Sequence, residues 1–141
     1  MRVIAFLLMA MTLAVTVDAS QSKKVSVGKY SPKKRIEATV TAYTPNPREN
    51  GGRGTRSGTA LGTRIRPGIV AVSRDLLRSG WEFGDKIHIE GLGVFTIEDT
   101  MHHRFRRTID VAVPDMNAAR KIGKMTRIEV TLLEVAPGSE S

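Results

Sequence analysis

The spacing of apolar residues predicts a chain built mostly of short strands. The segment IEATVTAYT at 36–44 is rich in β-branched residues, IVAVS at 69–73 is almost wholly apolar, and KIHIE at 86–90 alternates strictly. A period of two is typical of a strand with one buried face, and a short apolar run between turns fits a strand buried on both faces. Three further strands are expected at residues 94–98, 108–113 and 127–135.

Turn and cap residues predict how these strands are joined. The residues GLG at 91–93 lie between two alternating runs and predict a hairpin. Asp115 is a good N-cap for a short helix over 116–122, which Gly123 would end. One more helical turn is expected at 74–79.

Six short strands with one or two short helices suggest a small closed β-barrel, and we predict a mainly β fold of one domain over residues 36–135. A long glycine-rich loop at 46–62 joins the first two strands, and such loops are often functional. Hydrophobic residues make up 40% of the chain, which is enough for a packed core. The chain has no cysteine, which excludes disulfides and thiolate metal sites.

The first nineteen residues, 1–19, are expected to be a signal peptide. Arg2 gives a basic start, residues 3–17 are almost wholly apolar, and the small side chain of Ala19 suits cleavage. The apolar run is shorter than the roughly 20 residues of a comfortable membrane span, although an uncleaved anchor remains the alternative. We therefore expect a secreted protein of the periplasm or cell envelope.

The net charge of +8 is concentrated in residues 20–35, which hold six basic and no acidic side chains. A polar, basic segment buries too little apolar surface to fold, so we predict a disordered linker there and a disordered tail at 136–141. The basic segment would contact anionic envelope surfaces, with a spacer that has no partner as the alternative.

Two aspartates lie where strands seldom hold them. Asp110 lies inside TIDVAV, on the face opposite Ile109 and Val111, and Asp99 ends the preceding strand. We expect the two acids to lie at the mouths of adjacent strands. Close carboxylates do not both ionise easily, so one keeps the proton that a general acid needs. The plain alternatives are a solvent-facing charge at Asp110 and a turn-forming residue at Asp99.

The remaining candidates are weaker. Thr41 and Tyr43 share one face of the first strand and are able to hydrogen-bond a sugar or a carboxylic acid. His102 and His103 would point to opposite sides of an extended segment, and no third ligand lies at useful spacing, so we predict no metal site. The basic stretch at 101–107 also fits nucleic acid, but export argues against that partner.

In their order along the chain, these pieces resemble the three-aspartate (3D) domain. The matching pieces are TAYTP, the glycine-rich loop, IVAVSRDLL, FGDKI, EDT and IDV, with the last aspartate eleven residues after Asp99. That domain occurs in the membrane-bound lytic transglycosylase A family and in short secreted bacterial proteins that act on the cell wall. The resemblance covers about residues 38–133. It implies a six-stranded double-psi β-barrel that cleaves peptidoglycan between N-acetylmuramic acid and N-acetylglucosamine and leaves a 1,6-anhydro product.

The resemblance also implies roles for the candidate residues. Asp110 matches the catalytic acid/base, Asp99 matches its partner, and Thr41 and Tyr43 match the residues that support the site. The third aspartate of the family usually stands where this chain has Ser73, so we expect Asp75 to replace it.

The linker after Asp99 departs from the family pattern, because DTMHHRFRR replaces the usual Asp-Thr-Gly-Gly. Thr100, Arg104 and Arg107 of this linker are expected to support the substrate, with the arginines contacting the carboxylates of peptide stems. The altered linker also favours an alternative function, a non-catalytic glycan-binding barrel.

The implied reaction requires no cofactor, because the 6-hydroxyl of the sugar would itself attack C1. We expect the partner to be the glycan strands of peptidoglycan, with no nucleic acid, and the protein to be a monomer.

Overall fold

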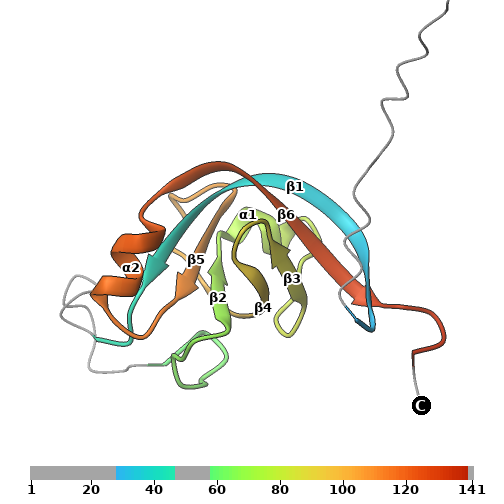
Figure 1. Cartoon of the computed structure of the whole chain (residues 1–141), viewed down its shortest axis with the longest axis horizontal. Helices are drawn as coiled ribbons and strands as arrows, with labels where there is room; N and C mark the ends of the chain where they lie inside the picture. The colour runs from blue at the N-terminus through green and yellow to red at the C-terminus, as the bar shows by residue number, and fades with distance from the viewer. Residues whose placement is uncertain (1–27, 47–57, 140–141) are drawn as a thin grey trace, which may run out of the picture.

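The structure is a computed structural model that describes residues 28–46 and 58–139. Six strands close into a barrel in the order β1-β5-β2-β4-β3-β6, which confirms the predicted mainly β barrel (Figure 1). Two short helices accompany it, α1 at Arg74–Arg78 and α2 at Met116–Ile122. The strands are β1 Tyr30–Tyr43, β2 Ile69–Val72, β3 Lys86–Ile89, β4 Gly93–Thr100, β5 Thr108–Ala112 and β6 Met125–Val135.

Two connections of the barrel interlock. β1 and β2 lie on either side of β5, and β4 and β5 lie on either side of β2. β1 runs parallel to β5 and β2 runs parallel to β4, whereas β2 and β5 are antiparallel. β1 and β2 are consecutive in the chain and have β5 between them, and β4 and β5 are consecutive and have β2 between them. This interlocking is the arrangement of a double-psi barrel. This interlock places β1, β5, β2 and β4 side by side.

Alternation along the strands fills the barrel. Val40, Ile109, Val70 and Ile97 are fully buried and belong to one hydrophobic cluster. Trp81, which follows α1, packs into the same cluster and is 1% exposed. Because these residues alternate with outward-facing positions, the polar residues between them lie on the outer face of the sheet.

The first strand begins earlier than the sequence predicts. β1 starts at Tyr30 and pairs with β6 in antiparallel register, and the two strands form the long arch over the barrel in Figure 1. Residues 30–35 of the predicted linker therefore belong to the barrel, and Arg35 lies 3.9 Å from Glu129 of β6. The first residue of the predicted disordered tail is also bound to the barrel, because the amide of Ala136 donates to the carbonyl of Lys29 at 2.8 Å.

Two of the three irregularities in strand pairing lie in the part of the barrel that carries the polar residues discussed below. In β4, Ile97 pairs with Val70 and Asp99 pairs with Ala71, so Glu98 is an extra residue. In β6, residues 126–127 lie opposite the single residue Thr39 of β1. Bulges of this kind bend a strand and redirect its side chains.

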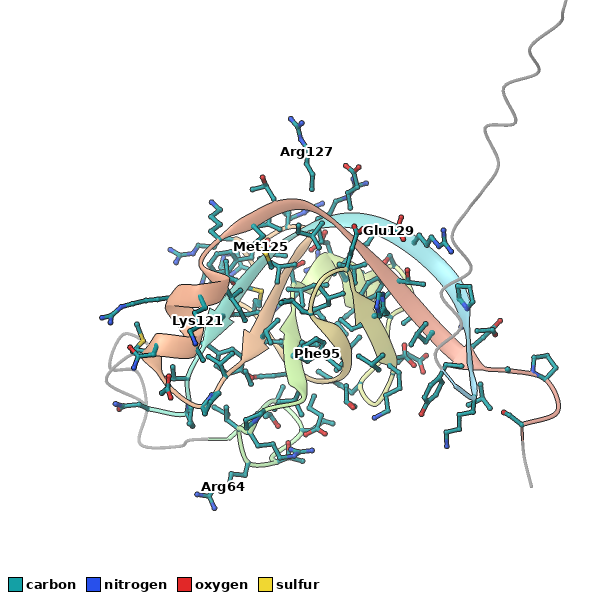
Figure 2. The ribbon with its side chains drawn as sticks, in the orientation of Figure 1. Arg64, Phe95, Lys121, Met125, Arg127 and Glu129 are labelled. Atoms are coloured by element: carbon teal, nitrogen blue, oxygen red, sulfur yellow. The ribbon has the colours of Figure 1, made fainter. Side chains whose placement is uncertain are left out.

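The predicted helix at 116–122 is confirmed together with its caps. The amide of Ala118 donates to Asp115 Oδ1 at 2.9 Å, and Gly123 ends the helix with φ of 59°. Lys121 of this helix and Arg64 of the loop before β2 project into solvent (Figure 2). Within residues 28–46 and 58–139, no helix is long and apolar enough to cross a membrane. The predicted signal peptide at 1–19 lies outside the described residues.

Removing a core side chain should destabilise the barrel far more than removing an exposed one. Ile87 is fully buried, so Ile87→Ala should cost about 2–5 kcal/mol of the free energy of unfolding. Leu61 is 48% exposed, so Leu61→Ala should stay within about 0.5 kcal/mol. Urea denaturation of both variants checks this, and equal losses would contradict the described core.

Candidate functional site

Register places three polar side chains in one row across four strands. Thr41 of β1 pairs with Asp110 of β5, Asp110 pairs with Ala71 of β2, and Ala71 pairs with Asp99 of β4. Residues directly opposite each other on paired strands project from the same face. The two aspartates therefore share a face with only the methyl group of Ala71 between them. Tyr43 lies two residues after Thr41 on the same face of β1. We call these four residues the carboxylate row: Thr41, Tyr43, Asp99 and Asp110.

The aspartates do not lie on adjacent strands, contrary to the sequence-based expectation. β2 separates β4 from β5 because the connection between them crosses over it. Neighbouring strands are about 4.8 Å apart, so the Cα atoms of Asp110 and Asp99 are about 10 Å apart. Their charges nevertheless interact, because Asp99 is among the groups that raise the pKa of Asp110.

Asp110 is half-buried and held by one hydrogen bond. Thr41 Oγ1 donates to Asp110 Oδ1 at 2.8 Å. Burial raises the pKa of Asp110, the nearby charge of Asp99 raises it further, and the hydrogen bond from Thr41 acts in the opposite direction. Asp110 is therefore half-buried and hydrogen-bonded, in contrast to the freely solvated charge of the plain alternative. Burial away from water is the main cause of the raised pKa of Asp110, whereas from the sequence we expected the charge of Asp99 to be the main cause.

Asp99 is fixed by backbone amides on both sides. Its Oδ1 accepts from the amide of Thr100 at 2.8 Å and from the amide of Ala60 at 2.9 Å. Ala60 belongs to the described part of the glycine-rich loop, whose residues 47–57 lie outside the described residues. Ala60 therefore contacts the carboxylate row through Asp99, and Asp99 Oδ2 accepts no hydrogen bond within the described part of the chain.

Glu98 is a site residue that the sequence did not single out. Arg66 binds it with two hydrogen bonds, Nη2 to Oε1 at 2.6 Å and Nη1 to Oε2 at 2.9 Å, and Thr63 Oγ1 donates to Oε2 at 2.6 Å. The hydrogen bonds from Arg66 and Thr63 lower the pKa of Glu98, although burial opposes them. The sequence did carry a signal for the special position of Glu98, because Glu98 and Asp99 are adjacent acids in an alternating strand. One of two adjacent residues must face inward unless the strand bulges.

Tyr43 has a buried hydroxyl with no hydrogen-bond partner among the residues that the structure describes. Burial raises the pKa of Tyr43 well above its ordinary value, and the charges of Asp99, Asp110 and Glu98 raise it further. The phenol thus stays neutral and is able to donate. A buried unpaired hydroxyl costs about 1–3 kcal/mol, so the group is suited to bind a ligand atom or a water molecule.

The other predicted site residues do not join the carboxylate row. Asp75 accepts from the backbone amide of Arg107 at 3.0 Å and so holds the turn before β5. Thr100 Oγ1 donates to the carbonyl of Val72 at 3.1 Å. Arg104 is exposed and lies 4.9 Å from the ring centre of Phe105.

Thr100 directly follows Asp99, whereas Asp75 and Arg107 lie at the other end of β5. Arg107 directly precedes the first residue of β5, whereas Tyr43 is level with its last residue, Ala112. The strand between them is about 13 Å long at about 3.3 Å per residue. Arg107 therefore lies away from Tyr43, and the predicted contact of the arginines with the carboxylates of peptide stems stays a prediction.

The two histidines are arranged differently from the prediction. The rings of His102 and His103 lie 4.0 Å apart instead of pointing to opposite sides, because the segment turns and the amide of Phe105 donates to the carbonyl of His102. No group of three or more side chains suited to a metal occurs within residues 28–46 and 58–139.

Comparison with known proteins supports the fold. No protein-family model matches the chain, and no curated protein matches its sequence. Among solved structures, the Streptomyces papain inhibitor is similar with a TM-score of 0.51 and 14% identity, over 73% of this chain and 97% of that one. An identity this low shows a related barrel and nothing about activity. The resemblance to the 3D domain is thus confirmed for the double-psi barrel and stays a prediction for the family.

Asp110→Asn should stabilise the protein at neutral pH. Burial and Asp99 raise the folded-state pKa of Asp110, so the stability it contributes is present below its unfolded pKa and is lost as pH rises through the folded pKa. Asparagine still accepts from Thr41 and carries no charge. We expect a gain of about 0.5–2 kcal/mol at pH 7 that shrinks at pH 4, measured by urea denaturation. A loss of stability at pH 7 would contradict the assigned burial cost.

Proposed function

We propose that the protein is a peptidoglycan lytic transglycosylase. It would cleave the bond between N-acetylmuramic acid and N-acetylglucosamine and form 1,6-anhydro-N-acetylmuramic acid. One observation carries the proposal: Asp110 is a half-buried carboxyl with a raised pKa, in the same row as Asp99. Such a group keeps its proton to higher pH than an ordinary aspartate, as a general acid must.

The hydrogen bonding of Asp110 indicates which atom delivers the proton. Oδ1 accepts from Thr41, which leaves Oδ2 to carry the proton. Oδ2–H would donate to the glycosidic oxygen as the bond from C1 to that oxygen breaks. The 6-hydroxyl oxygen of the same sugar then bonds to C1, and its proton passes to a carboxylate of Asp110 or Asp99. Because the nucleophile belongs to the substrate, no activated water is needed, in contrast to a hydrolase with two carboxylates.

The neighbouring groups suit supporting roles in this reaction. Asp99 is held by two amides and places negative charge where a ring with oxocarbenium character develops positive charge. The unpartnered hydroxyl of Tyr43 is a donor for a sugar oxygen. Glu98, which is paired with Arg66, holds the segment before β2 against the strand that carries Asp99.

The expected location agrees with this activity. The basic start and apolar run of residues 1–19 are typical of an exported protein, and we propose that residues 20–141 act as a monomer in the periplasm or envelope. A net charge of +8 favours contact with the anionic polymers and lipid headgroups found there.

Digestion of purified peptidoglycan by residues 20–141 tests the proposal. Mass spectrometry should detect anhydro-muropeptides, and Asp110→Asn should lower their rate of formation by at least about 100-fold, because general acid catalysis contributes about 10²–10⁴. Asp85→Asn is the matched control, since Asp85 accepts from the amide of Glu82 in the turn before β3, and it should stay within about twofold.

Two outcomes would oppose the enzyme. A loss below about tenfold in Asp110→Asn would remove Asp110 from the catalytic role. Sedimentation of the protein with the wall, without anhydro products, would favour the alternative of a non-catalytic glycan-binding barrel.

A further inference from the structure

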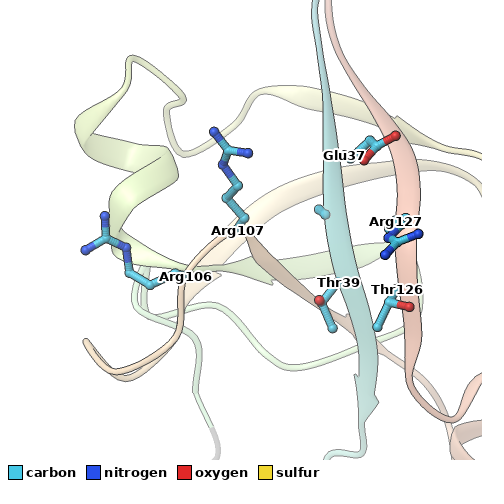
Figure 3. Close-up of a pocket in the computed structure, with 7 residues that line it drawn as sticks. Glu37, Thr39, Arg106, Arg107, Thr126 and Arg127 are labelled. Carbon is cyan, nitrogen blue, oxygen red and sulfur yellow. The ribbon is translucent and has the colours of Figure 1, made fainter.

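A pocket of about 230 Å³ lies beside the beginning of β5, at the end opposite Tyr43 (Figure 3). Its walls come from β1, from β6 and from the segment that leads into β5. The polar lining residues are Glu37, Thr39, Arg106, Arg107, Thr126 and Arg127. Figure 3 shows Arg106 and Arg107 on one side of β1, with Arg127 on the other.

The pocket carries an excess of positive charge. Three arginines line it, and Glu37 is the one acidic residue in its lining. Arg106 lies 3.7 Å from Asp75 with its side chain 74% exposed, a contact too exposed to neutralise it firmly. For Arg107 and Arg127, no ion pair of the side chain occurs within the described part of the chain. Two of the three cations are thus available to an incoming group.

The backbone at these two arginines is unusual. Arg107 has φ of 43° and Arg127 has φ of 56°, and in the described ranges they are the non-glycine residues with positive φ. Arg127 lies in the bulge of β6 opposite Thr39, where glycine would adopt this conformation without strain. Asp75 accepts from the amide of Arg107 and holds the other turn. Arginine is therefore present at two positions of one pocket where the backbone favours glycine, and strain of this kind is typical of binding sites.

We propose that this pocket binds the oxyanion group of a ligand, a phosphate or a carboxylate. The planar guanidinium groups of Arg107 and Arg127 suit two-point hydrogen bonding to such a group, and Thr39 and Thr126 add hydroxyl donors. The proposal does not rest on glycan cleavage, because the pocket and the carboxylate row use different residues. The pocket gives Arg106 and Arg107 of the 101–107 segment a role that is independent of the carboxylate row.

Binding of inorganic pyrophosphate and of citrate to residues 20–141 tests this site, by calorimetry and by amide chemical shifts. Arg127→Gly and Arg107→Gly should each raise the Kd at least about fivefold, since each removes one charge-assisted contact. Their Tm should be unchanged or higher by up to about 5 °C, because glycine relieves the left-handed backbone. Preserved stability with lost binding separates a ligand role from a structural one.

Three further variants sharpen the result. Arg64→Ala removes an equal charge outside the pocket and should leave the Kd within about twofold. Glu37→Gln removes the opposing carboxylate and should lower the Kd. Asp110→Asn should bind as the unmodified chain does, whatever its effect on glycan cleavage.

The two probes identify the ligand chemistry. Tighter binding of pyrophosphate indicates a phosphate ligand, and tighter binding of citrate indicates carboxylates. Equal binding by Arg127→Gly, Arg107→Gly and the unmodified chain, or shift changes spread over the whole surface, would overturn the proposal.

Discussion

The interlocked connections of the barrel determine where its acids lie. β5 lies between β1 and β2, and β2 lies between β5 and β4, so four strands from distant parts of the sequence share one register row. Thr41, Asp110 and Asp99 come from three of these strands, and the fourth contributes only the methyl group of Ala71. A larger side chain at Ala71 would separate the two acids. The candidate site therefore depends on topology more than on any single motif.

Three carboxylates lie close together in this region, and each has a different environment. Glu98 is ionised because Arg66 and Thr63 bind it. Asp99 is held by two backbone amides, and Asp110 has lost much of its water and receives one hydrogen bond from Thr41. When different environments separate the pKa values of neighbouring carboxyl groups, one of them can act as an acid and another as a base. The bulge at Glu98 makes this division possible, because it lets two consecutive acids serve different partners.

Local signals in the sequence predicted local structure well. The caps Asp115 and Gly123 act within a few residues, so the helix between them was predictable. Strand alternation correctly turned Asp110 away from the buried Ile109 and Val111. The start of β1 was missed because its basic residues are held by pairing with β6, about a hundred residues later. The separation of β4 from β5 and the partners of Glu98 were missed for the same reason, since both depend on contacts between distant segments.

The central claim is that burial, together with the charge of Asp99 two strands away, raises the pKa of Asp110 above that of an ordinary aspartate. Carbon-detected NMR titration of the side-chain carboxyls of the folded protein measures this directly, with Asp99→Asn as the comparison. The account predicts that Asp110 titrates above the ordinary value for aspartate, about 3.9, and that its pKa falls in Asp99→Asn while staying raised. Titration of Asp110 at or below the ordinary value would contradict the account.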